Sequence, residues 1–141
     1  MTPSIAPFQS FPLPRDLQAL KKFHGHLGPY VVLGFRMGKL ARERYPSKIR
    51  AMVLCGSDRP RSCMADGIQF SSCCTLGKGN IMVRDEGIVG AKFSDGTTAL
   101  LITAKPEIVA HIDEEMSHEN EEELSLEIFR TSDDELFVLD R

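Results

Sequence analysis

Three of the four cysteines lie in one short stretch, residues 63–80, and two histidines flank a glycine in the sequence His24-Gly25-His26. Thiolates and imidazoles are the ligands that zinc prefers in proteins, and nickel, copper and iron accept the same mixture. The candidate metal ligands carry soft nitrogen or sulfur atoms and are His24, His26, Cys63 and one of Cys73 or Cys74. We therefore predict one metal site built from both segments, with a transition metal, zinc before the others, as the cofactor.

A second interpretation of these residues involves no chemistry. Cysteine is often a small buried core residue, and a histidine in a loop often has its hydrogen bonds satisfied locally. The His-x-His pattern and isolated cysteines are common, so their spacing alone favours this structural interpretation. Residue types and spacing leave both interpretations open.

Cys63 is the cysteine that the sequence most favours as functional. It stands at the start of a short helix predicted over residues 63–70, where free N–H groups and the helix dipole favour negative charge. We therefore expect a lowered pKa for the Cys63 thiol, which favours the reactive thiolate. Asp66 and Gln69 lie three residues apart on one face of this helix, so both face one pocket. Asp66 is a candidate to orient a histidine ligand, to act as a base, or simply to cap the helix.

The segment 75–80, Thr-Leu-Gly-Lys-Gly-Asn, resembles a phosphate-binding loop because glycines allow close backbone approach and Lys78 adds positive charge. It is not a Walker A loop, since the two glycines bracket the lysine and no Ser or Thr follows it. We prefer a turn that leads into the next strand. Lys78 stays a candidate contact for an anionic substrate.

The elements that position the histidines are two helices. Apolar residues at three-residue spacing predict a helix over residues 16–23. The glycines that follow are expected to end this helix. Residues two apart point to the same side of an extended segment, so we expect His24 and His26 to converge in such a segment. Pro29 suits the first turn of a second helix over residues 29–45.

The rest of the chain predicts a mostly antiparallel sheet. Glycine turns and apolar strands indicate a meander, and the acidic run 113–123 is typical of a solvated surface. The further elements in chain order are strands 50–55, 80–85, 88–93 and 97–104, helix 106–116, and a terminal hairpin of strands 124–129 and 135–139. We predict a single α+β domain over residues 15–141, with N-terminal helices packed on the sheet.

Composition places the chain among ordinary globular proteins. Its 141 residues are 42% hydrophobic and 26% charged, with a net charge of −3, which disfavours nucleic-acid binding through phosphates. No apolar run approaches the roughly 20 residues of a membrane span, and we expect a cytoplasmic protein without membrane association. Residues 1–14 contain four prolines and no charge, so we expect an apolar arm that packs on a partner protomer.

Three separated motifs resemble the core domain of the FmdE family, which is named after formylmethanofuran dehydrogenase: FHGHLGPYVVLGFRMG, SCMADGIQ and CTLGKGN. The resemblance covers roughly residues 15–110, and three motifs in the right order are more specific than one. It implies an intertwined α+β homodimer with a metal pocket. The positions that it carries over are His24 and His26 as metal ligands, Cys63 and Cys74 as thiol ligands, Cys63 and Asp66 as catalytic candidates, and Gln69, Thr75 and Lys78 as substrate contacts.

The sequence departs from that family at two positions of the motifs. Many members have a cysteine where this chain has Gly28, and Cys73 replaces a common glycine. The chain also lacks the paired Cys-x-x-Cys motifs of longer members. Two functions follow as hypotheses: a metal-dependent enzyme or metal carrier for an unidentified small molecule, or a non-catalytic accessory component of a formylmethanofuran dehydrogenase-like molybdenum or tungsten oxidoreductase complex.

Overall fold

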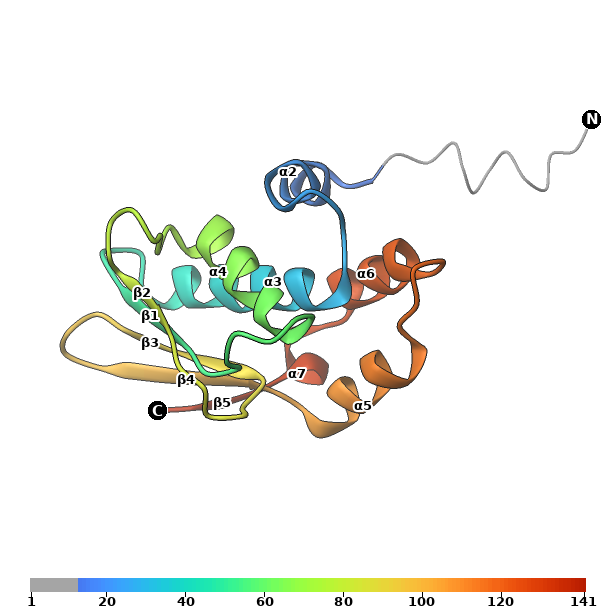
Figure 1. Ribbon diagram of the computed structural model, residues 1–141. Helices are drawn as coiled ribbons and strands as arrows, with labels where there is room; N and C mark the ends of the chain where they lie inside the picture. Colours follow the sequence, from blue (N-terminus) through green and yellow to red (C-terminus); the bar gives the residue numbers. More distant parts are fainter. Residues whose placement is uncertain (1–12) are drawn as a thin grey trace, which may run out of the picture.

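A five-stranded sheet in the order β2-β1-β3-β4-β5 lies at the centre of the computed structural model, which describes residues 13–141 (Figure 1). The strands are β1 (Arg50–Val53), β2 (Ile81–Val83), β3 (Gly90–Ser94), β4 (Ala99–Ala104) and β5 (Phe137–Asp140). β1 and β2 are parallel, whereas the other neighbours are antiparallel. The sheet is thus mixed but mostly antiparallel, and the predicted α+β class is confirmed.

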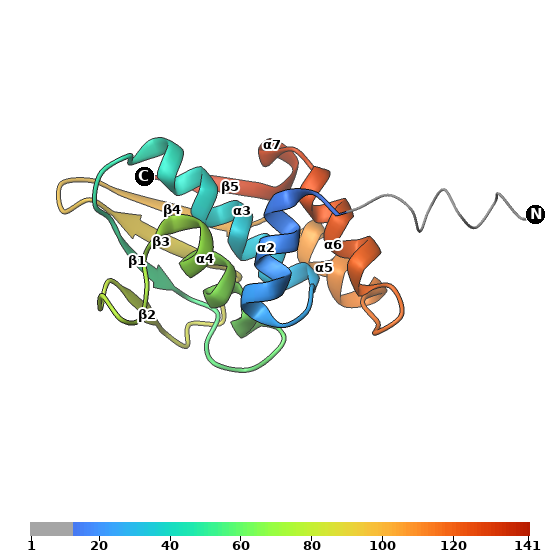
Figure 2. The same cartoon turned by 90° about the horizontal axis from the view of Figure 1, so that it is seen from above.

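Most of the helices lie on one side of this sheet (Figures 1 and 2). The helical elements are α2 (Arg15–His24), α3 (Pro29–Arg44), the 3-10 turn η1 (Arg61–Cys63), α4 (Met64–Ser72), α5 (Pro106–Glu115), α6 (Glu121–Arg130) and α7 (Asp133–Leu136). α3 and α4 lie on the sheet, α2 lies over them on the side away from the strands, and α5 lies beyond the end of the strands (Figures 1 and 2). No helix in residues 13–141 is long and apolar enough to cross a membrane.

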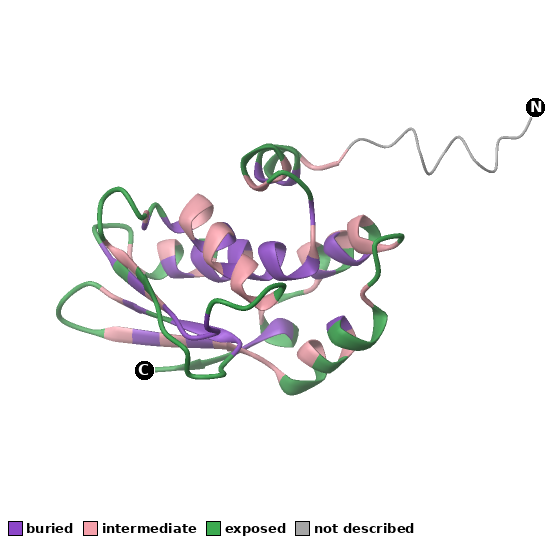
Figure 3. Ribbon diagram, in the orientation of Figure 1, coloured by how far each residue is buried: buried purple, intermediate pink, exposed green. Residues whose placement is uncertain are grey.

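α3 is the central helix of the core. Ten of its sixteen residues are buried, and Figure 3 shows most of its length in the buried class. A helix that is apolar around most of its circumference must be covered on several sides. The sheet, α4 and α6 provide that cover, so α3 contacts both the strands and the other helices of the core.

The contact between α3 and α4 is close because glycines face it from both helices. An added Cβ on Gly34 would overlap the carbonyl of Met64, and one on Gly67 would overlap the carbonyl of Val31. Glycine allows this backbone approach because it has no Cβ. The two helices therefore pack backbone against backbone at these positions.

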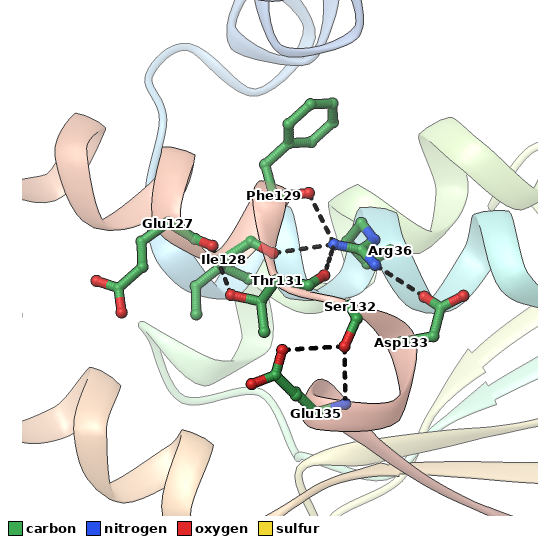
Figure 4. A network of polar contacts seen from close by, with 8 residues as sticks. All are labelled: Arg36, Glu127, Ile128, Phe129, Thr131, Ser132, Asp133 and Glu135. Atoms are coloured by element: carbon green, nitrogen blue, oxygen red, sulfur yellow. Dashed lines mark hydrogen bonds and ion pairs between the residues drawn. The ribbon is translucent and has the colours of Figure 1, made fainter.

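Arg36 of α3 fastens the C-terminal end of α6 (Figure 4). Its Nη1 donates hydrogen bonds to three backbone carbonyls at the end of that helix, those of Ile128 (3.0 Å), Phe129 (2.8 Å) and Thr131 (2.6 Å). Its Nη2 contacts Oδ1 of Asp133 at 2.8 Å. Terminal helix carbonyls need partners when they are half-buried. One guanidinium therefore satisfies the end of α6 and the start of α7.

The predicted helices over 16–23, 29–45, 63–70 and 106–116 are confirmed, with ends that differ by at most two residues. The predicted strands 50–55, 80–85, 88–93 and 97–104 are present in shorter form. The predicted apolar arm lies outside the described residues except for Leu13 and Pro14. The intertwined homodimer stays a prediction.

The predicted hairpin between strands 80–85 and 88–93 is wrong. β1 lies between β2 and β3, with Ala51 opposite Ile81 on one side and Phe93 on the other. β1 has buried residues, Ala51 and Val53, so it occupies an interior position in the sheet. The turn near Gly87 therefore carries the chain around the end of β1 and makes no hairpin. The turn between β3 and β4 is a hairpin, as predicted.

The predicted terminal hairpin is also wrong. Residues 121–130 form helix α6, in which Leu124 and Ile128 are buried at a spacing of four. Three glutamates in its first turn interact favourably with the positive end of the helix dipole. The last strand, β5, pairs with β4 in antiparallel register.

Substituting Gly67 by alanine tests the close helix contact. We expect Gly67→Ala to lower the free energy of unfolding by about 3 kcal/mol, because strain from overpacking exceeds the roughly 1 kcal/mol gain in helix propensity. Gly77→Ala is the control, since an added Cβ there meets open space, and we expect a change below about 0.5 kcal/mol. Urea unfolding midpoints measure both. Equal midpoints for the two variants would contradict the close packing.

Candidate functional site

A hydrogen-bonded pair, His24 and Asp66, joins the end of α2 to the first turn of α4. Nδ1 of His24 lies 2.6 Å from Oδ2 of Asp66. The His24 side chain is 9% exposed and that of Asp66 is 43% exposed. The hypothesis that Asp66 orients a histidine therefore fits the geometry, whereas Asp66 does not stand at the helix cap, which is Cys63. The proposed role of Asp66 as a base stays a prediction.

The other ring nitrogen of His24, Nε2, is buried and has no hydrogen-bond partner among the described residues. A carboxylate that accepts from Nδ1 fixes the tautomer in which Nε2 carries a lone pair. A carboxylate behind an imidazole also orients the ring, and this arrangement recurs behind metal-bound histidines. The geometry thus presents one oriented, desolvated nitrogen ligand.

His26 lies beside His24, with the two ring centroids 4.8 Å apart. The expected convergence of the two imidazoles is thus found, but not in an extended segment. His24 is the last residue of α2, and Gly25 then turns the chain in the left-handed conformation with φ of 105°. A Cβ on Gly28 would lie 4.0 Å from Nε2 of His26. A side chain at this position would therefore lie close to the His26 imidazole.

Cys63 is the N-cap of α4 and is half-buried. Burial raises the pKa of its thiol, and the negative charge of Asp66 raises it further, against a smaller opposite effect of Arg59. The expected lowering of the pKa of Cys63 is therefore wrong. The helix-end effect is weak here compared with desolvation and a nearby carboxylate.

Cys74 is fully buried, and its Sγ donates to the carbonyl of Ile49 at 3.4 Å. This contact is that of a core residue. Cys73, by contrast, is exposed and ends α4 in the left-handed conformation. Within residues 13–141 of one chain, no group of three or more His, Cys, Asp or Glu side chains is arranged to hold a metal. The structure therefore brings the two imidazoles and Asp66 together, and the complete four-ligand set stays a prediction.

The candidate substrate residues Gln69, Thr75 and Lys78 lie at the end of α4 and in the loop that follows it. Oε1 of Gln69 accepts from the backbone N–H of Leu76 at 2.9 Å, and the N–H of Thr75 donates to Oδ1 of Asn80 at 2.8 Å. This segment is a hydrogen-bonded turn into β2, in agreement with the turn favoured by its sequence. Lys78 lines hollows that do not include either histidine. Substrate contact by these residues stays a prediction.

A second polar cluster, which the sequence did not reveal, holds the turn before Cys63. The buried hydroxyl of Tyr30 donates to Oδ1 of Asp113 at 2.6 Å, and Arg61 Nη2 contacts Oδ2 of Asp113 at 2.9 Å. Burial and the Asp113 carboxylate raise the pKa of Tyr30, so its hydroxyl stays protonated and donates. One residue of the acidic run therefore has a structural role. The sequence signal for Tyr30 is its position directly after Pro29, in the first turn of α3.

A family model described as "FmdE, Molybdenum formylmethanofuran dehydrogenase operon" matches residues 23–138 of this chain. The match includes both histidines, the whole of α3 and α4, and the sheet as far as the first residues of β5. The chain belongs to the FmdE family. The resemblance of the three sequence motifs to this family is thereby confirmed.

A crystal structure of a tungsten formylmethanofuran dehydrogenase FmdE-like protein from Syntrophus aciditrophicus has the same fold. The TM-score is 0.65 at 22% sequence identity, and the match covers 88% of this chain and 68% of that one. At 22% sequence identity, the similarity between the two proteins shows a shared fold and nothing more. The FmdE-family fold thus accommodates sequences that have diverged widely.

A protein of Archaeoglobus fulgidus described as a probable S-adenosyl-L-methionine-binding protein is 38% identical to this chain over 80 residues. The match covers 53% of this chain but only 22% of that relative. The FmdE-family chain thus matches about a fifth of that longer protein. The description applies to the longer protein as a whole.

The charge of Asp66 next to Cys63 gives a prediction for thiol reactivity. In Asp66→Asn the carboxylate no longer raises the pKa of Cys63, so more thiolate is present at a given pH. We expect faster alkylation of Cys63 by iodoacetamide at neutral pH in chelator-treated protein, measured by peptide mass spectrometry. Cys73 in the same molecule is the internal control and should react at an unchanged rate. Slower or equal alkylation of Cys63 would contradict the effect of Asp66.

Proposed function

We propose that this FmdE-family protein binds a transition metal, zinc before the others, through Nε2 of His24. The observation that carries the proposal is that this nitrogen is buried and unpartnered within residues 13–141 while Asp66 holds the other side of the ring. An unsatisfied buried polar atom costs about 1–3 kcal/mol. A bound ligand that uses the lone pair would remove that cost.

A second imidazole and a thiol from the same segments support a metal as the occupant. His26 lies beside His24, and Cys63 lies three residues before Asp66, at the start of α4. A mixed nitrogen and sulfur set suits zinc. The other ligands would be water, a substrate, or side chains of a second copy of this chain in the proposed homodimer.

An enzymatic role would use the Lewis acidity of the bound ion, whereas a carrier role would need only its binding and release. A bound zinc ion polarises a carbonyl or phosphoryl oxygen and lowers the pKa of a bound water. In this chain His24 and His26 bind and Asp66 orients His24, while Cys63 is either a ligand or a nucleophile. The protein then acts as a metal-dependent enzyme on a small molecule, or as a metal carrier.

Metal content is the test of this proposal. For protein purified without a metal-affinity tag, loaded with zinc and dialysed free of excess, we expect about 0.5 to 1 equivalent of metal per chain by elemental analysis. His24→Ala should retain less than about a tenth of that amount. Asp66→Asn should keep the ligand but weaken zinc affinity about 10- to 100-fold, because it loses the orienting carboxylate.

His118→Ala is the matched control, since His118 is an exposed histidine outside the site and should leave zinc binding unchanged. Unfolding midpoints for all variants separate loss of ligand from loss of fold. Native protein that takes up less than about a tenth of an equivalent, or His24→Ala protein that binds as much as the native chain, would overturn the metal proposal.

The second candidate is a non-catalytic accessory or assembly component of a molybdenum or tungsten oxidoreductase. The observation that favours it is the description of the family, which refers to a formylmethanofuran dehydrogenase operon. Gentle affinity purification from native extract tests it. We expect components of a large oxidoreductase to copurify if this candidate is right, and recovery of a homodimer alone would contradict it.

A further inference from the structure

Two adjoining hollows lie at the end of the sheet where β1 begins. One has a volume of about 520 Å³ and the other about 340 Å³, and they share four lining residues. The shared residues are Lys48, Ile49, Lys78 and Asn80. Neither hollow is lined by His24, His26, Cys63 or Asp66. The hollows therefore form a second candidate site with different lining residues.

The charges around these hollows are almost all positive. Arg42, Lys48, Arg50 and Lys78 line them, and no one of the four forms an ion pair with a carboxylate within residues 13–141. The whole chain carries a net charge of −3, so this accumulation is local. Like charges that converge without counterions repel one another, which favours binding of an anion between them.

Only one acidic residue lines the two hollows, and its charge is already engaged. Oδ1 of Asp95 accepts the backbone N–H groups of Thr97 and Thr98, each at 2.8 Å. These bonds lower the pKa of Asp95 and hold its carboxylate in the turn between β3 and β4. Arg42 donates to the carbonyls of Ser47 and Pro46, which fixes its guanidinium at the rim. The three other cations have no such contact among the described residues.

A groove whose lining includes Met52, Met82 and Lys92 adjoins the larger hollow. Its volume is about 330 Å³, and it shares Arg50, Asn80 and Ser94 with that hollow. Met52 lies opposite Met82 across the parallel pair, so the two methionines stand on one face. Met82 is 55% exposed. Methionine side chains adapt to ligands of irregular shape.

We propose that the hollows and the groove form one site for a small anionic molecule with a dianionic head group, of the phosphate-ester kind, and an apolar body. The head group lies among Lys48, Arg50 and Lys78, and the body lies over Met52 and Met82. Three or four cations favour a dianion over a monoanion because each adds to the same potential. This site goes beyond the metal function and does not depend on it.

Binding of model compounds to the full chain tests the proposal. Phenyl phosphate carries both a dianionic head and an apolar body, and should shift the backbone amide signals of Lys48, Arg50 and Met82 saturably in proton–nitrogen correlation spectra. Benzoate has one charge and inorganic phosphate has no apolar body, so each should bind at least about threefold more weakly. Added salt should weaken the binding of phenyl phosphate.

Reversing two charges locates the site. In the double variant K48E/K78E we expect phenyl phosphate to bind at least about tenfold more weakly. Lys22→Glu makes the same kind of charge change at an exposed position on α2, and its affinity should stay within about twofold of the native value. The spectra themselves show whether each variant is folded. Shifts that do not saturate, benzoate binding equal to that of phenyl phosphate, or equal affinity of the double variant would overturn the proposal.

Discussion

The backbones of α3 and α4 approach each other closely at two glycines, Gly34 and Gly67. Glycines on both helices remove the side chains that would otherwise separate them, so backbone atoms of the two helices nearly touch at Gly34 and Gly67. Interiors packed at this density transmit small displacements, because little free volume is left to absorb them. An added side chain at either glycine would therefore push α3 and α4 apart.

This contact determines where the candidate site forms. Asp66 precedes Gly67 directly on α4, and His24 ends the helix that lies over both α3 and α4. Fixing α4 thus places the carboxylate that holds the His24 ring at 2.6 Å. On the other side of α3, Arg36 fastens the end of α6 through three carbonyls. The buried helix α3 therefore contacts α4, which carries Asp66, and also the C-terminal end of α6.

The sequence predicted those parts of the fold that local signals determine. Pro29 and the apolar residues after it define α3, and the two histidines and Asp66 were identified from residue type and spacing. The prediction for segment 124–129 was wrong because Leu124, Leu126 and Ile128 alternate as in a strand, while Leu124 and Ile128 also suit one face of a helix. The predicted pairing of β2 with β3 was wrong because β2 instead pairs in parallel with β1, and a parallel pairing depends on segments distant in the sequence. Local turn signals do not contain that information.

The chemistry of the site likewise combines features that local sequence signals predict with features that depend on the folded structure. The pairing of a histidine with Asp66 follows from residue types and was anticipated, whereas the pKa of Cys63 depends on burial and on a neighbouring charge. The burial of Cys74 beside Ile49 likewise results from packing that no motif describes. Lys78 was noted as a possible anion contact, but its companions Lys48 and Arg50 come from a distant part of the sequence and meet it only in the folded sheet.

We propose that Asp66 holds His24 so that Nε2 presents a lone pair to a metal ion. Long-range proton–nitrogen correlation spectra of the imidazole rings, recorded at about pH 8, measure the tautomer of each histidine directly. We expect the proton of His24 to reside on Nδ1 and zinc to shift the Nε2 signal. A proton on Nε2, or a zinc titration that leaves the Nε2 signal of His24 unchanged, would contradict the proposal.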